Sequence, residues 1–404
     1  MRLLYGFGIR LLGVAMHLAA LFNEKAKRWV QGRKNWQSQL QIPSNRKVVW
    51  FHCASLGEFD QGLPIMNALK QRDPQVFLLV TFFSPSGMQH YQKREHHVDL
   101  AVYLPLDTKV NANKFARIVR PSIVFFVKYE FWYNHLKAAR RAGAKIYGVS
   151  SLFRPEHRFF KWYGGFFRKA LRLFDHFFTQ DERSKQLLAS IGIDQATVSG
   201  DTRYDRMAAL ASKKPENEII AQFKGDRPLL ILGSSWPVDE ALLFTNLAIL
   251  QKSFQILIAP HDISEGHVQQ IIQNLSVPFQ RYTHFDAQVE SAVLILDTIG
   301  QLSAAYSYAT IAYVGGGFTG KLHNILEPGA FGVPVLFGPK YDRFPEASMF
   351  LDAGAALSID SDESFLKAIE TLLQEHAERS ENVQRVFAAN VGAADKVLAA
   401  LQLQ

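Results

Sequence analysis

Residues 310–339 constrain the fold more than any other stretch, because they carry the signals of a complete strand, loop, helix and strand unit. The apolar run 310–314 leads into three glycines, an Ala/Gly-rich helical turn follows, and a second apolar run, 334–337, closes the unit. This pattern predicts a βαβ unit. Because glycines 315–317 have no β-carbon, their backbone N–H groups can approach an anion or a sugar closely, beside the N-terminus of the next helix.

The glycine loop also comes close to the sequence of a nucleoside-triphosphate loop. Gly315, Gly320 and Lys321 have the spacing G-x-x-x-x-G-K, but Leu322 occupies the position of the Ser or Thr whose hydroxyl binds Mg²⁺. The missing hydroxyl disfavours this interpretation. A membrane-attached nucleotide-dependent ATPase stays open as an alternative function.

Asn324 and Glu327 lie three residues apart at the start of the following helix, so they share one helix face. Their side chains can hydrogen-bond a ribose diol or the edge of a sugar. Helix capping by Asn324 and a favourable helix-dipole interaction of Glu327 would explain the same residues without a ligand. The two interpretations are compatible, so a ligand role is not excluded.

Short apolar runs alternate with helical patterns along most of the chain, which predicts an α/β fold with parallel, doubly wound sheets. The expected strands are 48–53, 76–82, 123–127, 145–149, 197–199, 229–232, 255–259, 293–296, 310–314 and 334–337. The expected helices are 62–72, 134–142, 184–191, 239–250, 267–273, 364–376 and 382–401.

A chain of 404 residues exceeds the usual size of a single hydrophobic core. Residues 207–228 are polar and rich in helix breakers, so we expect the linker there. The prediction is an N-terminal Rossmann-like domain at 37–206 and a second one at 229–404, which includes the terminal helices, with a cleft between them.

Residues 1–36 predict a membrane-anchoring helix followed by a basic interface segment. The apolar run 3–22, interrupted by Arg10 and His17, is about as long as a bilayer span. The alternative is an amphipathic helix docked on the protein itself. The positive flank would place the other domains on the cytoplasmic side. Aromatic and basic residues of an interface segment follow at Lys25, Lys27, Arg28, Trp29, Arg33, Lys34 and Trp36.

The formal charge of +8 and the pI near 9.3 indicate an anionic partner. Nucleic-acid binding would require a basic face with aromatic stacking motifs, which the sequence does not show. An anionic membrane surface or a phosphorylated substrate is the favoured partner.

Ligands of open α/β sheets bind beyond the carboxyl ends of the strands, so polar residues at those positions are the candidates for chemistry. Glu58 follows the first strand and can act as a general base, although it would also complement the dipole of the next helix. Lys128 and Glu130 follow another strand and can grip a sugar acid or a phosphate, or simply form an ion pair. These motifs contain no Asp-x-Asp pair to hold a divalent metal, so we expect a metal-independent reaction.

Four motifs resemble those of Kdo transferases, the enzymes that add 3-deoxy-D-manno-oct-2-ulosonic acid (Kdo) to the lipid A precursor. Residues 323–328 and 332–339 fit the family's Asn-x-Leu-Glu-Pro and Gly-x-Pro-Val-x-x-Gly-Pro sequences, residues 55–58 fit Ser-x-Gly-Glu, and residues 130–132 fit Glu-x-Trp. With the N-terminal anchor included, the resemblance covers nearly the whole chain.

The resemblance implies a GT-B glycosyltransferase of lipopolysaccharide biosynthesis at the inner membrane, with CMP-Kdo as a co-substrate and no cofactor. The C-terminal domain would hold CMP-Kdo, and the N-terminal domain and the membrane would hold the lipid acceptor. Glu58 would be the catalytic base of an inverting displacement, Glu130 would assist the transition state, and Arg203 matches a position where the family has Lys. A GT-B-like protein that binds sugars without catalysis is a further alternative. Acceptor-side residues would be Ser55, Gly57 and Lys128.

The chain departs from the family pattern at three places among the expected site residues. The chain has Pro260-His261-Asp262 where Pro-Arg-His is usual, Arg203 where Lys is usual, and Gly300-Gln301 where Gly-Glu is usual. Arg and Lys differ in hydrogen-bonding geometry, so Arg203 is not a neutral exchange. The residues expected to bind CMP-Kdo are Ser234, Ser235, Pro260, His261, Ile299, Gly300, Gln301, Gly315, Gly316, Gly317, Asn324, Ile325, Leu326 and Glu327.

Overall fold

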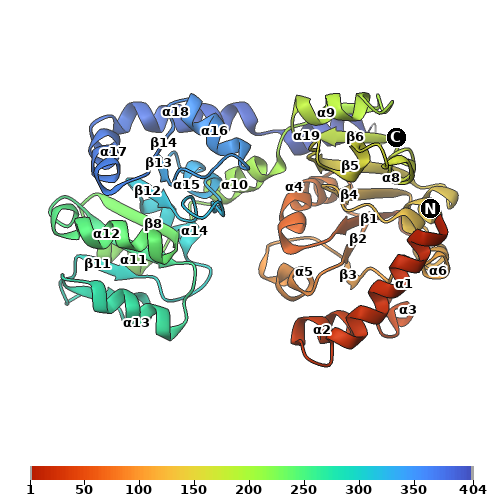
Figure 1. The fold of residues 1–404 in the computed structure, drawn as a ribbon, viewed down its shortest axis with the longest axis horizontal. Helices are drawn as coiled ribbons and strands as arrows, with labels where there is room; N and C mark the ends of the chain where they lie inside the picture. The colour runs from red at the N-terminus through yellow and green to blue at the C-terminus, as the bar shows by residue number, and fades with distance from the viewer. Residues whose placement is uncertain (1, 402–404) are drawn as a thin grey trace. The chain divides into compact units, whose positions relative to one another are not determined.

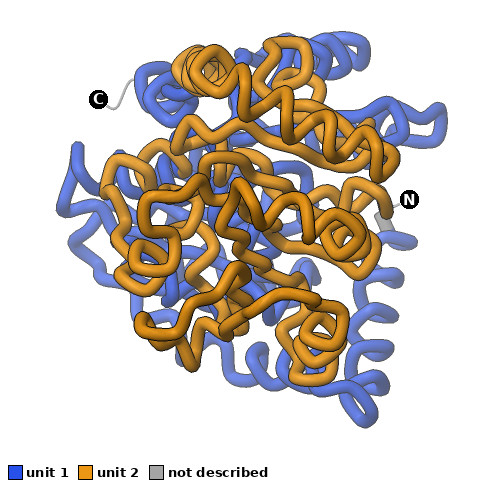
Figure 2. Tube along the Cα trace, turned by 90° about the vertical axis from the view of Figure 1, so that its left-hand side faces the viewer, with its two compact units in different colours: residues 1–206, 391–404 blue, residues 207–390 orange. Residues whose placement is uncertain are grey.

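The computed structural model describes residues 2–401. The chain divides into two compact units, which Figure 2 colours separately: unit 1 comprises residues 1–206 and 391–404, and unit 2 comprises residues 207–390. Within the described residues, each unit has one parallel sheet of seven strands surrounded by helices (Figure 1). The prediction of two doubly wound α/β domains is therefore confirmed.

The sheet of unit 1 has the strand order β3-β2-β1-β4-β5-β6-β7. Every residue of β1 and β4 is buried, which explains why their sequences are continuous apolar runs. The strand order reverses between β1 and β4, and the carboxyl ends of strands at such a point are the usual place for a ligand. The strands are β1 Val48–Cys53, β2 Phe77–Phe82, β3 Leu100–Tyr103, β4 Ile123–Val127, β5 Lys145–Ser151, β6 His176–Thr179 and β7 Ala196–Val198.

Two hydrophobic cores lie on the two faces of this sheet. Successive side chains of β1 alternate between the two faces of the sheet, so that Trp50 belongs to one core and Phe51 to the other. Helices α6, α7, α8 and α9 cover the Trp50 face, and α4 and α19 cover the Phe51 face. The helices are α4 Leu56–Arg72, α5 Pro85–His90, α6 Lys109–Val119, α7 Tyr133–Arg141, α8 Gly165–Leu171, α9 Glu182–Ala189 and α19 Ala393–Ala400.

Unit 2 repeats this architecture with the strand order β10-β11-β9-β8-β12-β13-β14, which reverses between β8 and β12. Its strands are β8 Leu229–Ser235, β9 Gln255–Pro260, β10 Phe279–Arg281, β11 Val293–Ile295, β12 Ile311–Val314, β13 Val335–Phe337 and β14 Ala356–Ser358. Its helices are α11 Glu218–Lys224, α12 Pro237–Leu250, α13 Glu265–Asn274, α14 Leu302–Ala305, α15 Leu326–Gly329, α16 Pro345–Asp352, α17 Asp362–Gln374 and α18 His376–Asn390.

Two of the expected boundaries are wrong. The presumed linker 207–228 contains the end of α10 (Thr202–Ser212) and the whole of α11, whose Ile220 and Phe223 are buried in the core of unit 2. The expected helix 382–401 is broken at Gly392, which has φ +101 and separates α18 from α19. Because α19 packs against α4, the C-terminal helix belongs to unit 1 and not to the second domain.

The N-terminal segment forms α1 (Arg2–Ala19), α2 (Glu24–Gln31) and α3 (Trp36–Gln39) along unit 1 (Figure 1). Ile9 and Gly13 of α1 are buried against the protein. On the rest of the helix, large apolar side chains are exposed. Among residues 2–401, every helix falls short of the length and apolar character needed to cross a bilayer. The exposed apolar side chains of this segment are Leu3, Leu4, Phe7, Leu11, Val14, Leu18, Leu21 and Phe22.

Candidate active site

Glu58 lies in the first turn of α4, directly after β1. One oxygen of its carboxylate, Oε2, accepts a hydrogen bond from the backbone N–H of Ala54, which turns the side chain back over the end of the strand. Burial raises the pKa of Glu58 to about 7, with a smaller rise from the negative charge of Glu130 and an opposing effect of the Ala54 N–H. A carboxylate with a pKa near neutrality is suited to accept a proton at physiological pH.

Glu130 follows β4, the strand next to β1, so the fold brings the two predicted carboxylates to one edge of the sheet. The Glu130 side chain is 40% exposed, but its Oε2 atom is buried without a hydrogen-bond partner in the described part of the chain. Burial raises the pKa of Glu130 to about 7 as well. A buried acceptor that lacks a donor beside the candidate base is a place where a substrate hydroxyl can bind.

His52, on β1, lies near Glu130 and was missed by the sequence analysis. Its Nε2 atom accepts a hydrogen bond from Trp132 Nε1 at 3.1 Å, so the ring proton is on Nδ1, which donates to Thr81 Oγ1 at 2.9 Å. Complete burial lowers the pKa of His52 to about 3, so the ring stays neutral. Its Nε2 lies 4.0 Å from Glu130 Oε2 and cannot supply that oxygen with a proton.

The other predicted residues of unit 1 lie on α4, after β4 and at the start of α10. Ser55 is the N-cap residue of α4, and Gly57 is exposed in its first turn. Lys128 has φ +63, a left-handed conformation that costs a lysine about 1–3 kcal/mol and is common at functional sites. Arg203 forms an ion pair with Asp201 at 2.6 Å. Thr202, the residue before Arg203, donates to the Gln61 carbonyl of α4 at 2.6 Å, which ties this segment to the helix of Glu58.

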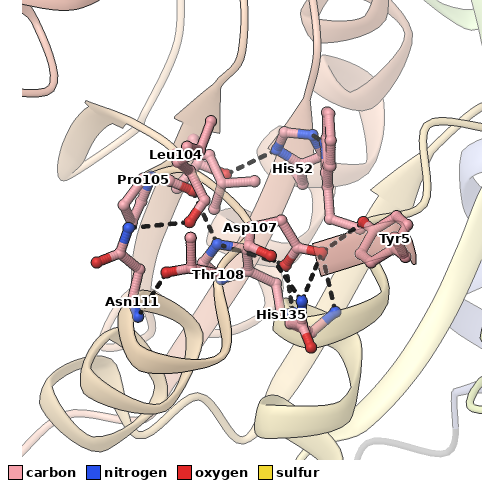
Figure 3. Close-up of polar contacts among 12 residues, drawn as sticks. Tyr5, His52, Leu104, Pro105, Asp107, Thr108, Asn111 and His135 are labelled. Carbon is pink, nitrogen blue, oxygen red and sulfur yellow. Dashed lines mark hydrogen bonds and ion pairs between the residues drawn. The ribbon is translucent and has the colours of Figure 1, made fainter. Parts of the chain in front are cut away.

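A buried network fastens the N-terminal segment to the same edge of the sheet. Figure 3 shows the Asp107 carboxylate between Tyr5 and His135. Tyr5 donates its hydroxyl hydrogen to Asp107 at 2.5 Å, and the backbone N–H groups of Asn134 and His135 donate to it at 3.0 and 2.8 Å. The carboxylate therefore joins α1 to the N-terminus of α7, directly after the Glu130-Phe-Trp132 motif.

In unit 2, the predicted donor residues lie at the carboxyl ends of β8 and β9 or in the loops that follow β9, β11 and β12. Ser234 has φ +53, and Ser235 is buried and donates to Glu240 at 2.9 Å. Pro260 ends β9, and the exposed His261 follows it. The fold therefore gathers the predicted donor residues at the edge where α/β proteins bind ligands, next to the switch between β8 and β12.

The glycine loop is not the open anion cradle that its sequence suggests. The N–H of Gly315 donates to the Gly233 carbonyl and that of Gly316 to the buried Asp239 carboxylate, at 2.9 and 3.0 Å. Added β-carbons at Gly315 and Gly317 would lie 2.3 Å from the Ser234 carbonyl and 2.4 Å from the Gly338 nitrogen, respectively. The glycines are thus needed for close backbone packing, and Gly316 for its φ of +91.

The same geometry argues against a triphosphate loop. Lys321 is exposed, its backbone N–H bonds to the Gly316 carbonyl at 2.9 Å, and α15 begins only at Leu326. In a triphosphate loop the lysine stands at the start of the helix, where the helix N-terminus faces the phosphates. Lys321 is separated from that helix by a stretch of loop.

Asn324 and Glu327 hydrogen-bond to each other beside the start of α15. Asn324 Oδ1 accepts from the N–H of Leu326 at 3.3 Å, as a helix cap does, and its amide donates to Glu327 at 3.3 Å. Glu327 also accepts from the Ser303 hydroxyl at 2.6 Å. The pair is half-buried, which leaves polar atoms for a ligand. Gln301 accepts from the Asn217 amide at 3.0 Å, a contact across 84 positions that sequence spacing does not indicate.

The remaining donor candidates divide into exposed and buried residues. Ile299 is 78% exposed, and Gly300 adopts φ +98 beside it. Ile325 and Leu326 are buried in the protein, so their side chains belong to the core and only their backbone is available to a ligand. Their identity in the motif is therefore explained by packing.

Trp236 is the functional candidate that the sequence analysis missed in unit 2. Its ring stacks on His261 at 4.4 Å between centroids, and its Nε1 donates to His323 at 3.2 Å. Lys321 Nζ lies 5.4 Å from the centre of the same ring. An aromatic stack beside a cation can accept a flat base or a phosphate. Its position directly after Ser234-Ser235 at the end of β8 is the sequence signal that would have found it.

An Asp-x-Asp sequence lies outside the predicted motifs. Asp360-Ser361-Asp362 stands at the start of α17, where Ser361 caps the helix by accepting from the Ser364 N–H. The Ser364 hydroxyl donates to Asp360 at 3.0 Å. Helix capping therefore explains why these residues occur at the start of α17.

Comparisons with known sequences show which proteins this chain is similar to. Residues 28–206 match the family described as 3-deoxy-D-manno-octulosonic-acid transferase (kdotransferase). A 3-deoxy-D-manno-octulosonic acid transferase of Chlamydophila psittaci is 26% identical over 85% of this chain and 82% of its own length.

Solved structures share the fold at low sequence identity. A UDP-N-acetylglucosamine 2-epimerase from Listeria monocytogenes matches with a TM-score of 0.65 and 15% identity, over 88% of this chain and 96% of that one. MurG from Acinetobacter baumannii matches with a TM-score of 0.53 and 15% identity, over 89% and 100% of the two chains. These likenesses establish the GT-B type of fold. The family match over residues 28–206, the curated relatives and the placement of the motifs together show that the chain is similar to Kdo transferases.

Proposed function

We propose that this protein is an inverting glycosyltransferase that moves Kdo from CMP-Kdo to a lipid A precursor, lipid IVA, in lipopolysaccharide biosynthesis. The observation that carries the proposal is the carboxylate of Glu58, held over the end of β1 with a pKa near 7 in a chain that is similar to Kdo transferases. Product analysis with a lipid A precursor and CMP-Kdo tests it.

The reaction is a direct displacement at the anomeric carbon of Kdo. The oxygen of an acceptor hydroxyl attacks this carbon, the carbon's bond to the phosphate oxygen of CMP breaks, and the bonding electron pair leaves with CMP. The hydroxyl proton passes to Glu58, whose pKa suits a general base. Attack opposite to the leaving group inverts the configuration. Glu130 assists from the neighbouring strand by orienting the acceptor through its unpartnered oxygen.

Unit 2 holds CMP-Kdo as a co-substrate, and the reaction needs no cofactor and no metal. Asn324 and Glu327 bind the ribose or sugar hydroxyls, and the stacked rings of Trp236 and His261 lie beside them as a platform for the base or the phosphate. Lys321, near Trp236, supplies a positive charge where the family's Arg after Pro260 is missing. The metal independence is tested by a chelator, which should leave the rate of transfer unchanged.

The Lys321→Ala variant separates this donor site from a nucleotide-dependent ATPase. Loss of one cation near the phosphate should raise KM for CMP-Kdo about tenfold, because a hydrogen bond to a charged group contributes about 1.5–3 kcal/mol. Steady-state kinetics measures this change, and phosphate release from ATP is followed in parallel. ATP hydrolysis by the unmodified protein that disappears in the variant would instead favour the ATPase.

The N-terminal segment docks on the cytoplasmic face of the inner membrane, where the glycolipid acceptor resides. The exposed apolar residues of α1, among them Phe7 and Leu11, would enter the headgroup region, with the cations of α2 beside anionic lipids. We expect Phe7→Asn/Leu11→Asn to lower binding to anionic vesicles at least tenfold, since each side chain contributes about 1.5–3 kcal/mol when fully buried. Vesicle flotation measures it, and unchanged flotation would contradict the docking.

A further inference from the structure

A cavity of about 190 Å³ lies between α1, the segment around α2 and α3, and the loop after β3. Pro105 and Asn111, labelled in Figure 3, line it on the side of that loop. His17, Arg33 and Lys34 bring basic groups to it, and its lining residues within 2–401 include no acidic residue. Its volume corresponds to about six water molecules, which is enough for a phosphate group and part of its ester.

Arg33 brings a half-buried positive charge that stacks on the Trp29 ring at 3.8 Å and that no carboxylate balances within residues 2–401. Its Nε, Nη1 and Nη2 atoms donate to the carbonyls of Leu104, Trp29 and Phe83 at 2.9, 3.0 and 2.8 Å. These bonds use three of the five N–H donors of a guanidinium and neutralise none of its charge. Burial accordingly lowers the pKa of Arg33 to about 9. A bound anion at this place would remove that penalty.

Trp29 gives a second, independent indication that an anion binds in this cavity. It is only 4% exposed and lines the cavity, and its indole N–H is buried with no hydrogen-bond partner in the described part of the chain. An indole N–H is a donor only, so the partner that would satisfy it is an acceptor oxygen. Lys34, on the rim, is exposed, and its ammonium has no partner among residues 2–401.

The position of the cavity indicates which kind of molecule would supply that acceptor oxygen. Gly13 and His17 line it from α1, whose outer side carries Leu11, Val14 and Leu18 exposed to the surroundings. A cavity on the helix that is proposed to rest on the membrane is at the depth of lipid headgroups. Phosphate is the acceptor group that all glycerophospholipids and phosphorylated glycolipids carry there.

We propose that this cavity is a binding site for the phosphate of a membrane lipid, held by Arg33, Lys34 and the indole N–H of Trp29. The residues that line the cavity include none of the candidate catalytic residues Glu58, Glu130 and Arg203. It rests on the proposed membrane docking of α1, but its test reads lipid binding and not sugar transfer. Failure of this proposal and failure of the proposed enzymatic activity can therefore be told apart.

The test compares two kinds of vesicle with a phosphate-free digalactosyldiacylglycerol matrix and matched surface potential, one made anionic by phosphatidylglycerol and the other by the carboxylate of cholesteryl hemisuccinate. The full chain should prefer the phosphatidylglycerol vesicles about tenfold in a flotation assay, because charge-assisted hydrogen bonds to a phosphate add to the general attraction. Lys34→Gln and Trp29→Phe should abolish this preference. Thermal unfolding verifies that each variant is folded.

Lys25→Gln is the matched control, because Lys25 is an exposed lysine of α2 that does not line the cavity. It should weaken binding to both vesicles equally, by at most about fivefold, and keep the preference. Equal binding of the unmodified protein to both vesicles, or the same loss in both lysine variants, would overturn the proposal. Competition by inorganic phosphate as effective as that by lipid phosphate would show a site for a soluble anion and overturn the lipid assignment.

Discussion

Replacing Glu58 by glutamine should lower kcat for Kdo transfer by about 10²–10⁴-fold, the usual contribution of a general base. Glutamine keeps the shape of the side chain and an oxygen that can accept the Ala54 N–H, so the first turn of α4 should stay intact. It cannot take the proton from the acceptor hydroxyl. Rapid-quench or steady-state kinetics with saturating CMP-Kdo measures the loss.

The pH dependence gives this prediction a second readout. Glu58 acts as a base only when it is ionised, so kcat should fall about tenfold per pH unit below its pKa of about 7 and level off above it. CMP binding, measured by calorimetry, should be unchanged in Glu58→Gln because the donor residues lie in unit 2. A variant that retains full turnover, or a pH profile that does not change with the substitution, would rule out Glu58 as the base.

Replacing Asp107 by alanine should lower the free energy of unfolding by about 3–5 kcal/mol. Asp107 is buried, and its removal would leave the Tyr5 hydroxyl and the N–H groups of Asn134 and His135 without their acceptor. The same change would release α1 from the N-terminus of α7. Urea denaturation measures the loss, and limited proteolysis within residues 2–19 reports whether α1 has detached.

Tyr5→Phe is the matched control for this prediction. It removes one donor and leaves Asp107 with both backbone N–H groups, so it should cost only about 1 kcal/mol. Equal destabilisation by the two substitutions would show that the loss comes from α1 alone and not from the buried carboxylate. No measurable effect of Asp107→Ala would contradict the network itself.

The central strands of both sheets could be predicted from sequence because burial on both faces makes them continuous apolar runs. The ten expected strands all exist, and β1 and β4 have the expected bounds. The missed strands β3, β10 and β14 lie at sheet edges, where partial exposure interrupts the apolar run. The missed strand β6, His176–Thr179, contains only two apolar residues, Phe177 and Phe178, which is too short an apolar run to predict a strand.

The candidate site was predictable where its residues follow strands, as Glu58, Glu130 and His261 do. The contacts that hold the site in place were not, because they join residues far apart in sequence. Trp132 reaches His52 across 80 positions and Trp236 reaches His323 across 87. The role of the glycine loop was predicted wrongly for Gly315 and Gly316, since their N–H groups serve the protein's own acceptors, Gly233 and Asp239.

One measurement tests the central claim most directly. The purified full chain is incubated with lipid IVA and a coupled supply of CMP-Kdo, and the lipid products are weighed by mass spectrometry. The proposed function predicts lipid IVA carrying added Kdo, with the number of added residues read from the mass, and no such product with Glu58→Gln. Unmodified lipid IVA after incubation with a protein that demonstrably binds CMP-Kdo would contradict it and indicate a sugar-binding protein without transferase activity.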